Sequence, residues 1–189
     1  MPSIVELMFV AALVVCLTTA AVPATAGVVD EVQASGAARY LVTRLRLARL
    51  EAVKRSAAVG IRFQARSGRI EFGAYLDGNG DGVRSRDITG GVDPPVGSTE
   101  LLSFHFPGVD FGFIPGVPAI DEPSGSASDP IRVGSSDILS FSPTGSASSG
   151  TLYFKGRGNQ QYAVRVLGVT GRVRLWRFDV ATRTWSAHS

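Results

Sequence analysis

The sequence has few of the side chains that carry enzymatic chemistry. Its 189 residues include one cysteine, Cys16, and two histidines, His105 and His188. No disulfide can therefore form between two cysteines of this sequence, and no nucleophile, histidine and carboxylate occur in a pattern typical of hydrolases. No glycine-rich phosphate loop follows an expected strand and opens a helix. We therefore expect a protein that is not an enzyme and has no organic cofactor.

Positive charge is also missing from the start of the chain, where the first lysine or arginine is Arg39. Cleaved secretory signals begin with a positively charged region, so this pattern is not typical of one. No charged residue lies between Glu6 and Asp30. Residues 7–29 would span roughly 35 Å as a helix, which is enough to cross a bilayer. We therefore expect residues 1–27 to form a transmembrane helix.

Two residues are unusual in such a segment. Glu6 places a carboxylate in or near hydrocarbon, which is costly unless the charge is paired or lies among the lipid headgroups. Pro23 removes one backbone hydrogen bond and kinks a helix that continues past it. From the residues alone, the simplest interpretation of Glu6 is a position at the headgroups.

Helical spacing continues beyond Pro23. Leu41, Leu45, Ala48 and Ala52 recur on one side, with arginines around them. We predict one long helix that bends at Pro23 and at Gly36. Residues 1–27 form its transmembrane half, and residues 28–57 form its amphipathic half.

The pattern changes from helical to strand-like after Ser56. Residues 58–66 and 69–77 alternate between apolar and polar side chains and are joined by a two-residue turn, Ser67-Gly68, typical of a hairpin. The further expected strands are 101–106, 137–141, 151–155, 161–167 and 172–178. A helix followed by strands indicates an α+β fold. We expect residues 58–189 to form one antiparallel β domain, with two sheets packed against the helix.

The local motif most typical of a ligand site is DGNGDGVRSRD, residues 77–87. Asp77, Asn79 and Asp81 alternate as in the first half of a calcium loop, which would direct three side-chain oxygens at one cation. The twelfth position, however, is Ile88 rather than a glutamate. The motif therefore leaves two interpretations, a calcium site and a tight Asx- and glycine-rich turn.

The last part of the chain is basic, although the whole sequence carries a formal charge of only +3. Arg172 and Arg174 flank Val173, so both would point from one face of a strand. Paired guanidinium groups suit phosphate oxygens, which would allow contact with DNA. A solvated outer strand face explains the same pattern.

The N-terminus resembles that of type IV pilins and pseudopilins. Counted from Pro2 in PSIVELM, Glu6 is fifth and Pro23 is twenty-second, the positions of the family's glutamate and proline. The resemblance implies that Glu6 pairs with the N-terminal ammonium of a neighbouring subunit, so that Glu6 and Pro23 serve subunit assembly. It also implies processing by prepilin peptidase and N-methylation at Pro2.

Residues 41–63, 138–154 and 162–178 narrow the resemblance to the H-type minor pseudopilins of type II secretion (the general secretion pathway protein H family) and the related T-type minor pilins. The resemblance implies a pilin-like fold and a structural subunit of the inner-membrane pseudopilus. It further implies a single pass through the bacterial inner membrane, a periplasmic globular domain and other pseudopilins as partners. The alternative is a minor type IV pilin that binds DNA for uptake through Arg172 and Arg174, within the motif Gly171-Arg172-Val173-Arg174.

Overall fold

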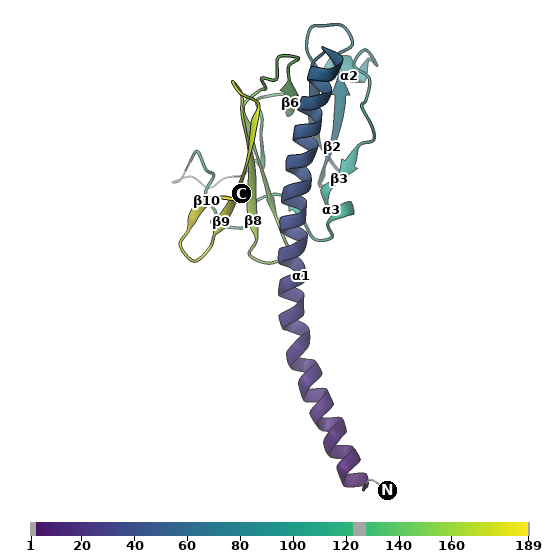
Figure 1. Cartoon of the computed structure of the whole chain (residues 1–189), viewed down its shortest axis with the longest axis vertical. Coiled ribbons are helices and arrows are strands. Elements are labelled where there is room, and N and C mark those ends of the chain that lie inside the picture. Colours follow the sequence, from purple (N-terminus) through teal and green to yellow (C-terminus); the bar gives the residue numbers. More distant parts are fainter. Residues whose placement is uncertain (1–2, 123–127, 189) are drawn as a thin grey trace.

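A single long helix, α1 (Ile4–Arg55), dominates the computed structural model, which describes residues 3–122 and 128–188. Within residues 16–26 only the helical backbone is described. The Ser3 hydroxyl accepts a hydrogen bond from the Val5 N–H and caps the start of α1. Ser56, in the left-handed region at φ 51°, ends the helix. Figure 1 shows that the second half of α1 lies among the strands while the first half extends beyond them.

The first sheet has four antiparallel strands in the order β3-β2-β1-β6. They are β1 (Val59–Arg66), β2 (Arg69–Leu76), β3 (Glu100–Leu101) and β6 (Ile138–Phe141). The turn between β1 and β2 has positive φ at both Ser67 (51°) and Gly68 (77°), as the twist of a two-residue hairpin requires. The predicted hairpin is therefore confirmed.

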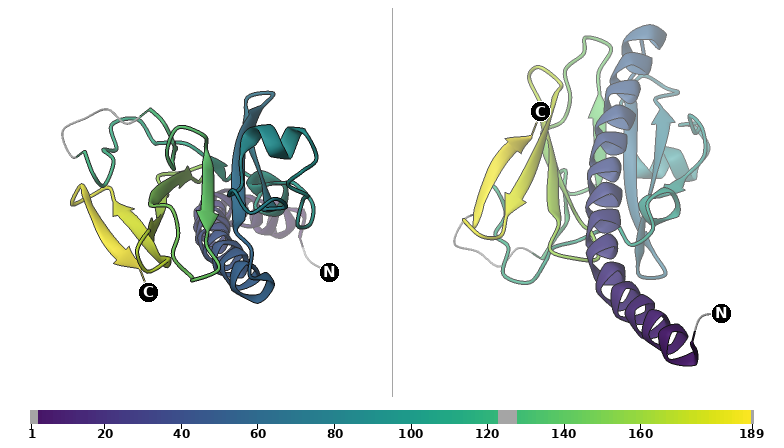
Figure 2. Two further views of the ribbon diagram at one scale, coloured as in Figure 1. Left: turned by 90° about the horizontal axis from the view of Figure 1, so that it is seen from above. Right: turned by 60° about the horizontal axis from the view of Figure 1, so that its bottom comes forward.

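The second sheet is antiparallel and has the order β10-β9-β8-β7-β4, with β5 also paired to β7. Its strands are β4 (Asp110–Phe111), β5 (Ile131–Arg132), β7 (Gly150–Lys155), β8 (Gln161–Leu167), β9 (Arg172–Asp179) and β10 (Thr184–His188). The α+β class and the two antiparallel sheets are thus as predicted. Figure 2 shows α1 where the two sheets meet, with one sheet on each side.

One hydrophobic core joins the helix to both sheets. The helix contributes a stripe of small and branched side chains that are at most 8% exposed: Ala34, Ala37, Ala38, Leu41, Val42, Leu45, Ala48 and Ala52. Alanines let the strands approach the helix axis closely. Gly36 serves the same purpose, because a Cβ there would lie 2.9 Å from the Phe106 ring.

Several elements differ from the prediction. The expected strand over 101–106 is wrong beyond Leu101, because Leu102–His105 form a short helix, α3. Leu102 is buried and Phe106 packs against the core, a spacing of four that suits a helical turn. Helix α2 (Ser85–Thr89) and the strands β4, β5 and β10 were not predicted. β10 is short and mostly exposed, so it lacks the alternation that identifies a strand in sequence.

Candidate functional site

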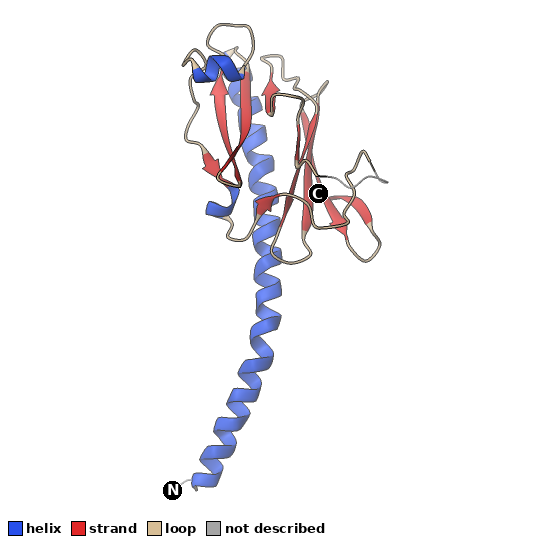
Figure 3. Cartoon of the chain, turned by 180° about the vertical axis from the view of Figure 1, so that it is seen from behind, coloured by secondary structure: helices blue, strands red, loops and turns tan. Residues whose placement is uncertain are grey.

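The first half of α1 extends beyond the folded domain (Figure 3). Within residues 4–15 exposed apolar side chains lie on all sides of the helix; Ile4 is 78% exposed and Phe9 is 72% exposed. Glu6 is exposed in the same stretch, and within the described part of the chain it makes no ion pair. A continuous apolar surface of this kind marks contact with lipid or with other proteins.

The structure leaves several predictions about this segment untested. No described helix contains a stretch both long and apolar enough to span a membrane. Pro23 lies within α1, in the part whose side chains are not described, and Pro2 lies outside the described residues. The pairing of Glu6 and the roles of Pro23 and Pro2 therefore stay predictions.

A carboxylate–tyrosine contact ties α1 to the second sheet. Glu31 on α1 accepts a hydrogen bond from the Tyr162 hydroxyl (2.9 Å) and forms an ion pair with Arg177 Nη2 (3.1 Å). Tyr162 is only 1% exposed. Burial, together with the hydrogen bond to Glu31, raises the pKa of Tyr162 to about 12. This Glu31 contact fixes the point at which α1 enters the domain.

A second contact of the same chemistry ties α1 to the first sheet, with the partners exchanged. Here the tyrosine, Tyr40, is on the helix and donates its hydroxyl hydrogen bond to Glu100 on β3. Glu100 also accepts from Arg44 Nη2 at 2.6 Å, and His105 Nε2 lies 3.4 Å away. Burial first, then the hydrogen bond to Glu100, raises the pKa of Tyr40 to about 12. In this Glu100 contact, the His105 ring lies beside a carboxylate that already binds Tyr40 and Arg44.

The sequence analysis missed both contacts. The partners Glu31 and Tyr162 are 131 positions apart, and no local pattern connects them. The only sign in the sequence was Glu31 itself, a carboxylate at the boundary between the apolar and the amphipathic half of the helix.

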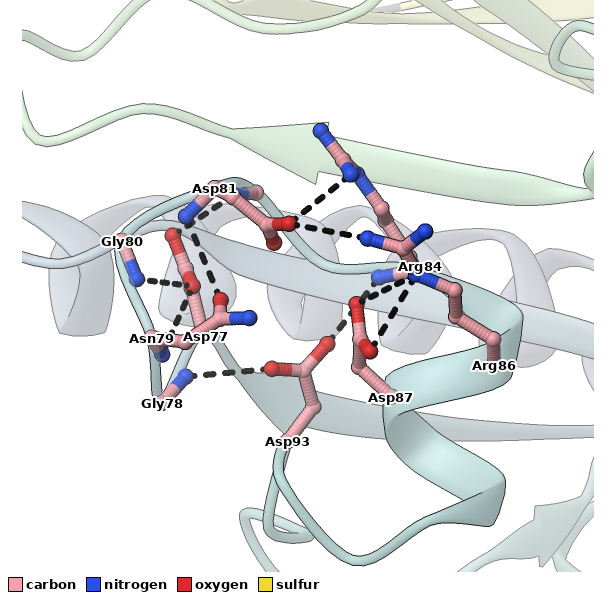
Figure 4. Close-up of polar contacts among 10 residues, drawn as sticks. Asp77, Gly78, Asn79, Gly80, Asp81, Arg84, Arg86, Asp87 and Asp93 are labelled. Carbon is pink, nitrogen blue, oxygen red and sulfur yellow. Dashed lines mark hydrogen bonds and ion pairs between the residues drawn. The ribbon is translucent and has the colours of Figure 1, made fainter.

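The acidic loop that follows β2 is held together by hydrogen bonds between aspartate carboxylates and backbone N–H groups (Figure 4). The Asp77 carboxylate accepts from the backbone N–H groups of Gly80 (2.8 Å) and Gly82 (2.9 Å). Buried Asp93 accepts from the N–H groups of Gly78 (3.1 Å) and Arg84 (3.0 Å). These contacts make the Asx- and glycine-rich turn that the sequence allowed.

Asp81, the third proposed calcium ligand, is paired with arginines. Its Oδ2 lies 2.8 Å from Arg84 Nη1 and 3.1 Å from Arg86 Nη2. Among the described residues, no group of three or more His, Cys, Asp or Glu side chains is arranged to hold a metal ion. A calcium ion at Asp77, Asn79 and Asp81 would thus compete with backbone amides and guanidinium groups, and calcium binding stays a prediction.

Arg172 and Arg174 lie at the start of β9, where both are exposed and Val173 between them is buried. The predicted shared face is therefore observed. Neither guanidinium has a carboxylate partner within the described residues. His188, at the end of β10, packs edge-on to the Tyr162 ring. His188 and His105 are far apart in the sequence, and they contact different residues, Tyr162 and Glu100 respectively.

Residues 37–170 match the family model described as Type II transport protein GspH. Two solved structures of the minor pseudopilin EpsH from the type II secretion system of Vibrio cholerae are similar. The first shares 18% identity at a TM-score of 0.47, over 76% of this chain and 95% of that one. The second shares 19% identity at a TM-score of 0.47, over 76% and 92% respectively. A search of curated proteins returned no match.

The raised pKa of Tyr162 predicts a loss of stability in alkali. The folded value of about 12 exceeds the unfolded value of roughly 10, so the contribution is complete below pH 10 and disappears as pH rises toward 12. Tyr162→Phe should cost about 1 kcal/mol at pH 7 through the lost hydrogen bond and should reduce the alkaline loss. Denaturant unfolding of the full chain in neutral detergent at pH 8 and pH 11 measures both effects.

Tyr75→Phe is the control for this experiment, because the Tyr75 hydroxyl makes no hydrogen bond within the described residues. If Tyr162→Phe and Tyr75→Phe lose the same stability between the two pH values, the Glu31 contact is not the origin of the effect.

The acidic loop predicts that Asp77→Asn destabilises the domain by roughly 1–3 kcal/mol, because the N–H groups of Gly80 and Gly82 lose the charged acceptor that buried Asp77 supplies. Asn79→Ala is the matched control, since Asn79 accepts only the Asp81 N–H at 3.2 Å. Thermal unfolding in EDTA and in millimolar calcium tests the cation. A calcium-dependent rise in melting temperature that Asp77→Asn abolishes would establish the site. An unchanged melting temperature would contradict it.

Proposed function

The chain belongs to the Type II transport protein GspH family, and from this we propose that it is a minor pseudopilin. In this role it is a structural subunit of the inner-membrane pseudopilus that drives protein export by type II secretion. The family match over residues 37–170 supports a role in type II secretion, and the exposed apolar side chains of residues 4–15 are the structural observation that carries the pseudopilin role. A structural subunit needs no catalytic constellation, in keeping with the contacts of His105 and His188.

The N-terminal half of α1 would supply both the anchor and the assembly surface. Its exposed side chains, from Ile4 to Val15, leave apolar area on every side of the helix. Lipid or the helices of other pseudopilins would cover that area, at roughly 25 cal/mol for each Å² removed from water. One helix would thus join the subunit first to the inner membrane and then to the filament.

Glu6 would set the register between neighbouring helices. An unpaired carboxylate is costly in an apolar bundle, whereas a carboxylate beside an ammonium group is neutralised. The proposed partner is the N-terminal ammonium of an adjacent subunit, exposed after prepilin peptidase acts at Pro2. The globular domain, 58–189, would then lie on the periplasmic side and present its sheets at the filament surface.

Glu6→Gln tests this proposal. It keeps the size and polarity of the side chain but removes the charge, so we expect incorporation into pseudopili and secretion to fall at least tenfold while the protein still accumulates in the membrane. Glu51→Gln is the control, because Glu51 also lies on α1 and, among the described residues, pairs with Lys54 and Arg55 alone, at the surface. Full secretion with Glu6→Gln would contradict a paired charge.

DNA capture is the second candidate, and it rests on the exposure of Arg172 and Arg174 without carboxylate partners among the described residues. It predicts salt-dependent binding of the full chain to duplex DNA, measured by fluorescence anisotropy, that weakens in Arg172→Ala/Arg174→Ala. Absence of binding at low salt would eliminate this candidate and leave secretion.

A further inference from the structure

An open groove runs between the second half of α1 and the start of β9. Its volume is about 1240 Å³, larger than the roughly 300–1,000 Å³ of small-molecule sites. The helix wall consists of a single stripe, since residues 39, 42, 46, 49 and 53 recur every three or four positions. The strand wall consists of residues 171–175, with Ala187 and His188 at one end. The groove therefore suits a segment of a macromolecule better than a metabolite.

The lining carries charge of one sign. Five arginines line the groove, Arg39, Arg46 and Arg49 from α1 and Arg172 and Arg174 from β9, and no aspartate or glutamate does. Arg49 donates to the Gly145 carbonyl oxygen at 2.8 Å. The other four make no ion pair within the described residues. Arginines gathered in this way repel one another and attract an anionic partner.

The strand wall also has an open hydrogen-bonding edge. β10 pairs with residues 175–179 of β9, so within the described chain the edge of β9 at 172–174 has no strand beside it. Such an edge presents both N–H donors and C=O acceptors that another strand can use. Val42, Leu50 and Val53 on the opposite wall supply apolar contacts beside it.

We propose that this groove binds an extended acidic segment of another protein, which adds a strand to β9 while its carboxylates meet the arginines. Strand addition gives affinity through the backbone, and alternate side chains give specificity. The groove is about 21 Å long along the helix, which matches roughly six extended residues. The proposal does not depend on a role in secretion.

The same features argue against other anions. A phosphodiester backbone has acceptors but no N–H donors for the strand carbonyls, and it has no use for the apolar wall of Val42, Leu50 and Val53. Lipid headgroups next to the N-terminal apolar segment would not reach the groove. Arg49 lies about 30 Å of helix beyond residue 29, where the apolar segment ends, whereas a headgroup layer is only about 5–8 Å deep. A peptide satisfies the charge, the apolar wall and the open edge together.

Fluorescence anisotropy of the full chain in neutral detergent tests the proposal. The probe is a labelled octapeptide of alternating glutamate and valine, and we expect saturable binding. Arg46→Glu should weaken it by about tenfold, because Arg46 lines the groove, is exposed and makes no side-chain hydrogen bond or ion pair within the described residues. Arg69→Glu is the matched control: it reverses an exposed arginine outside the groove and should change the affinity less than twofold.

Two further probes separate the components of binding. The same octapeptide with N-methylated alternate amides keeps the charges but cannot pair along a strand, and it should bind at least fivefold more weakly. A labelled oligothymidylate carries phosphates without a peptide backbone and should bind more weakly than the octapeptide. The proposal is overturned if the octapeptide does not bind, or if Arg69→Glu weakens it as much as Arg46→Glu. Unchanged affinity of the methylated peptide, or tighter binding of the oligothymidylate, also overturns it.

Discussion

Burial of one stripe of α1 between two sheets is the interaction on which the rest of this structure depends. The stripe is rich in alanine, and its larger members, Leu41 and Leu45, are fully buried. Both sheets contribute to the same core, so neither has a complete apolar face without the helix. The domain is therefore built around the second half of a helix whose first half extends beyond both sheets (Figure 1).

That division explains why the polar contacts lie where they do. Apolar packing alone would let a smooth helix slide or turn between the sheets, since small side chains offer few steric stops. The Glu31 contact and the Glu100 contact fix the helix against each sheet in turn, through Tyr162 and Tyr40 respectively. Both contacts lie at the edge of the core, where each carboxylate also forms an ion pair with an arginine. Forces applied along the exposed half of α1 would thus be passed to both sheets.

Much of the fold followed from local patterns. The hairpin over Ser67-Gly68 alternates between apolar and polar residues, strands 151–155 and 161–167 are short, mostly apolar runs, and the helix carries its apolar stripe at helical spacing. The strand predicted beyond Leu101 was wrong because four residues are too few to distinguish a helical turn from a strand. The exposed face of Arg172 and Arg174 was predicted, but its position beside α1 was not. The groove depends on how residues 39–53 and 171–175 meet, which no local pattern encodes.

We propose that residues 4–15 of α1 contact other subunits while the second half of the helix stays in the core. Site-specific photocrosslinking in membranes of secreting cells tests it most directly, with a crosslinker at Phe9, which is 72% exposed, and a control at buried Leu41. The account predicts adducts from position 9 with the N-terminal helices of other pseudopilins and only internal adducts from position 41. Lipid adducts alone from position 9, with secretion active, would contradict it.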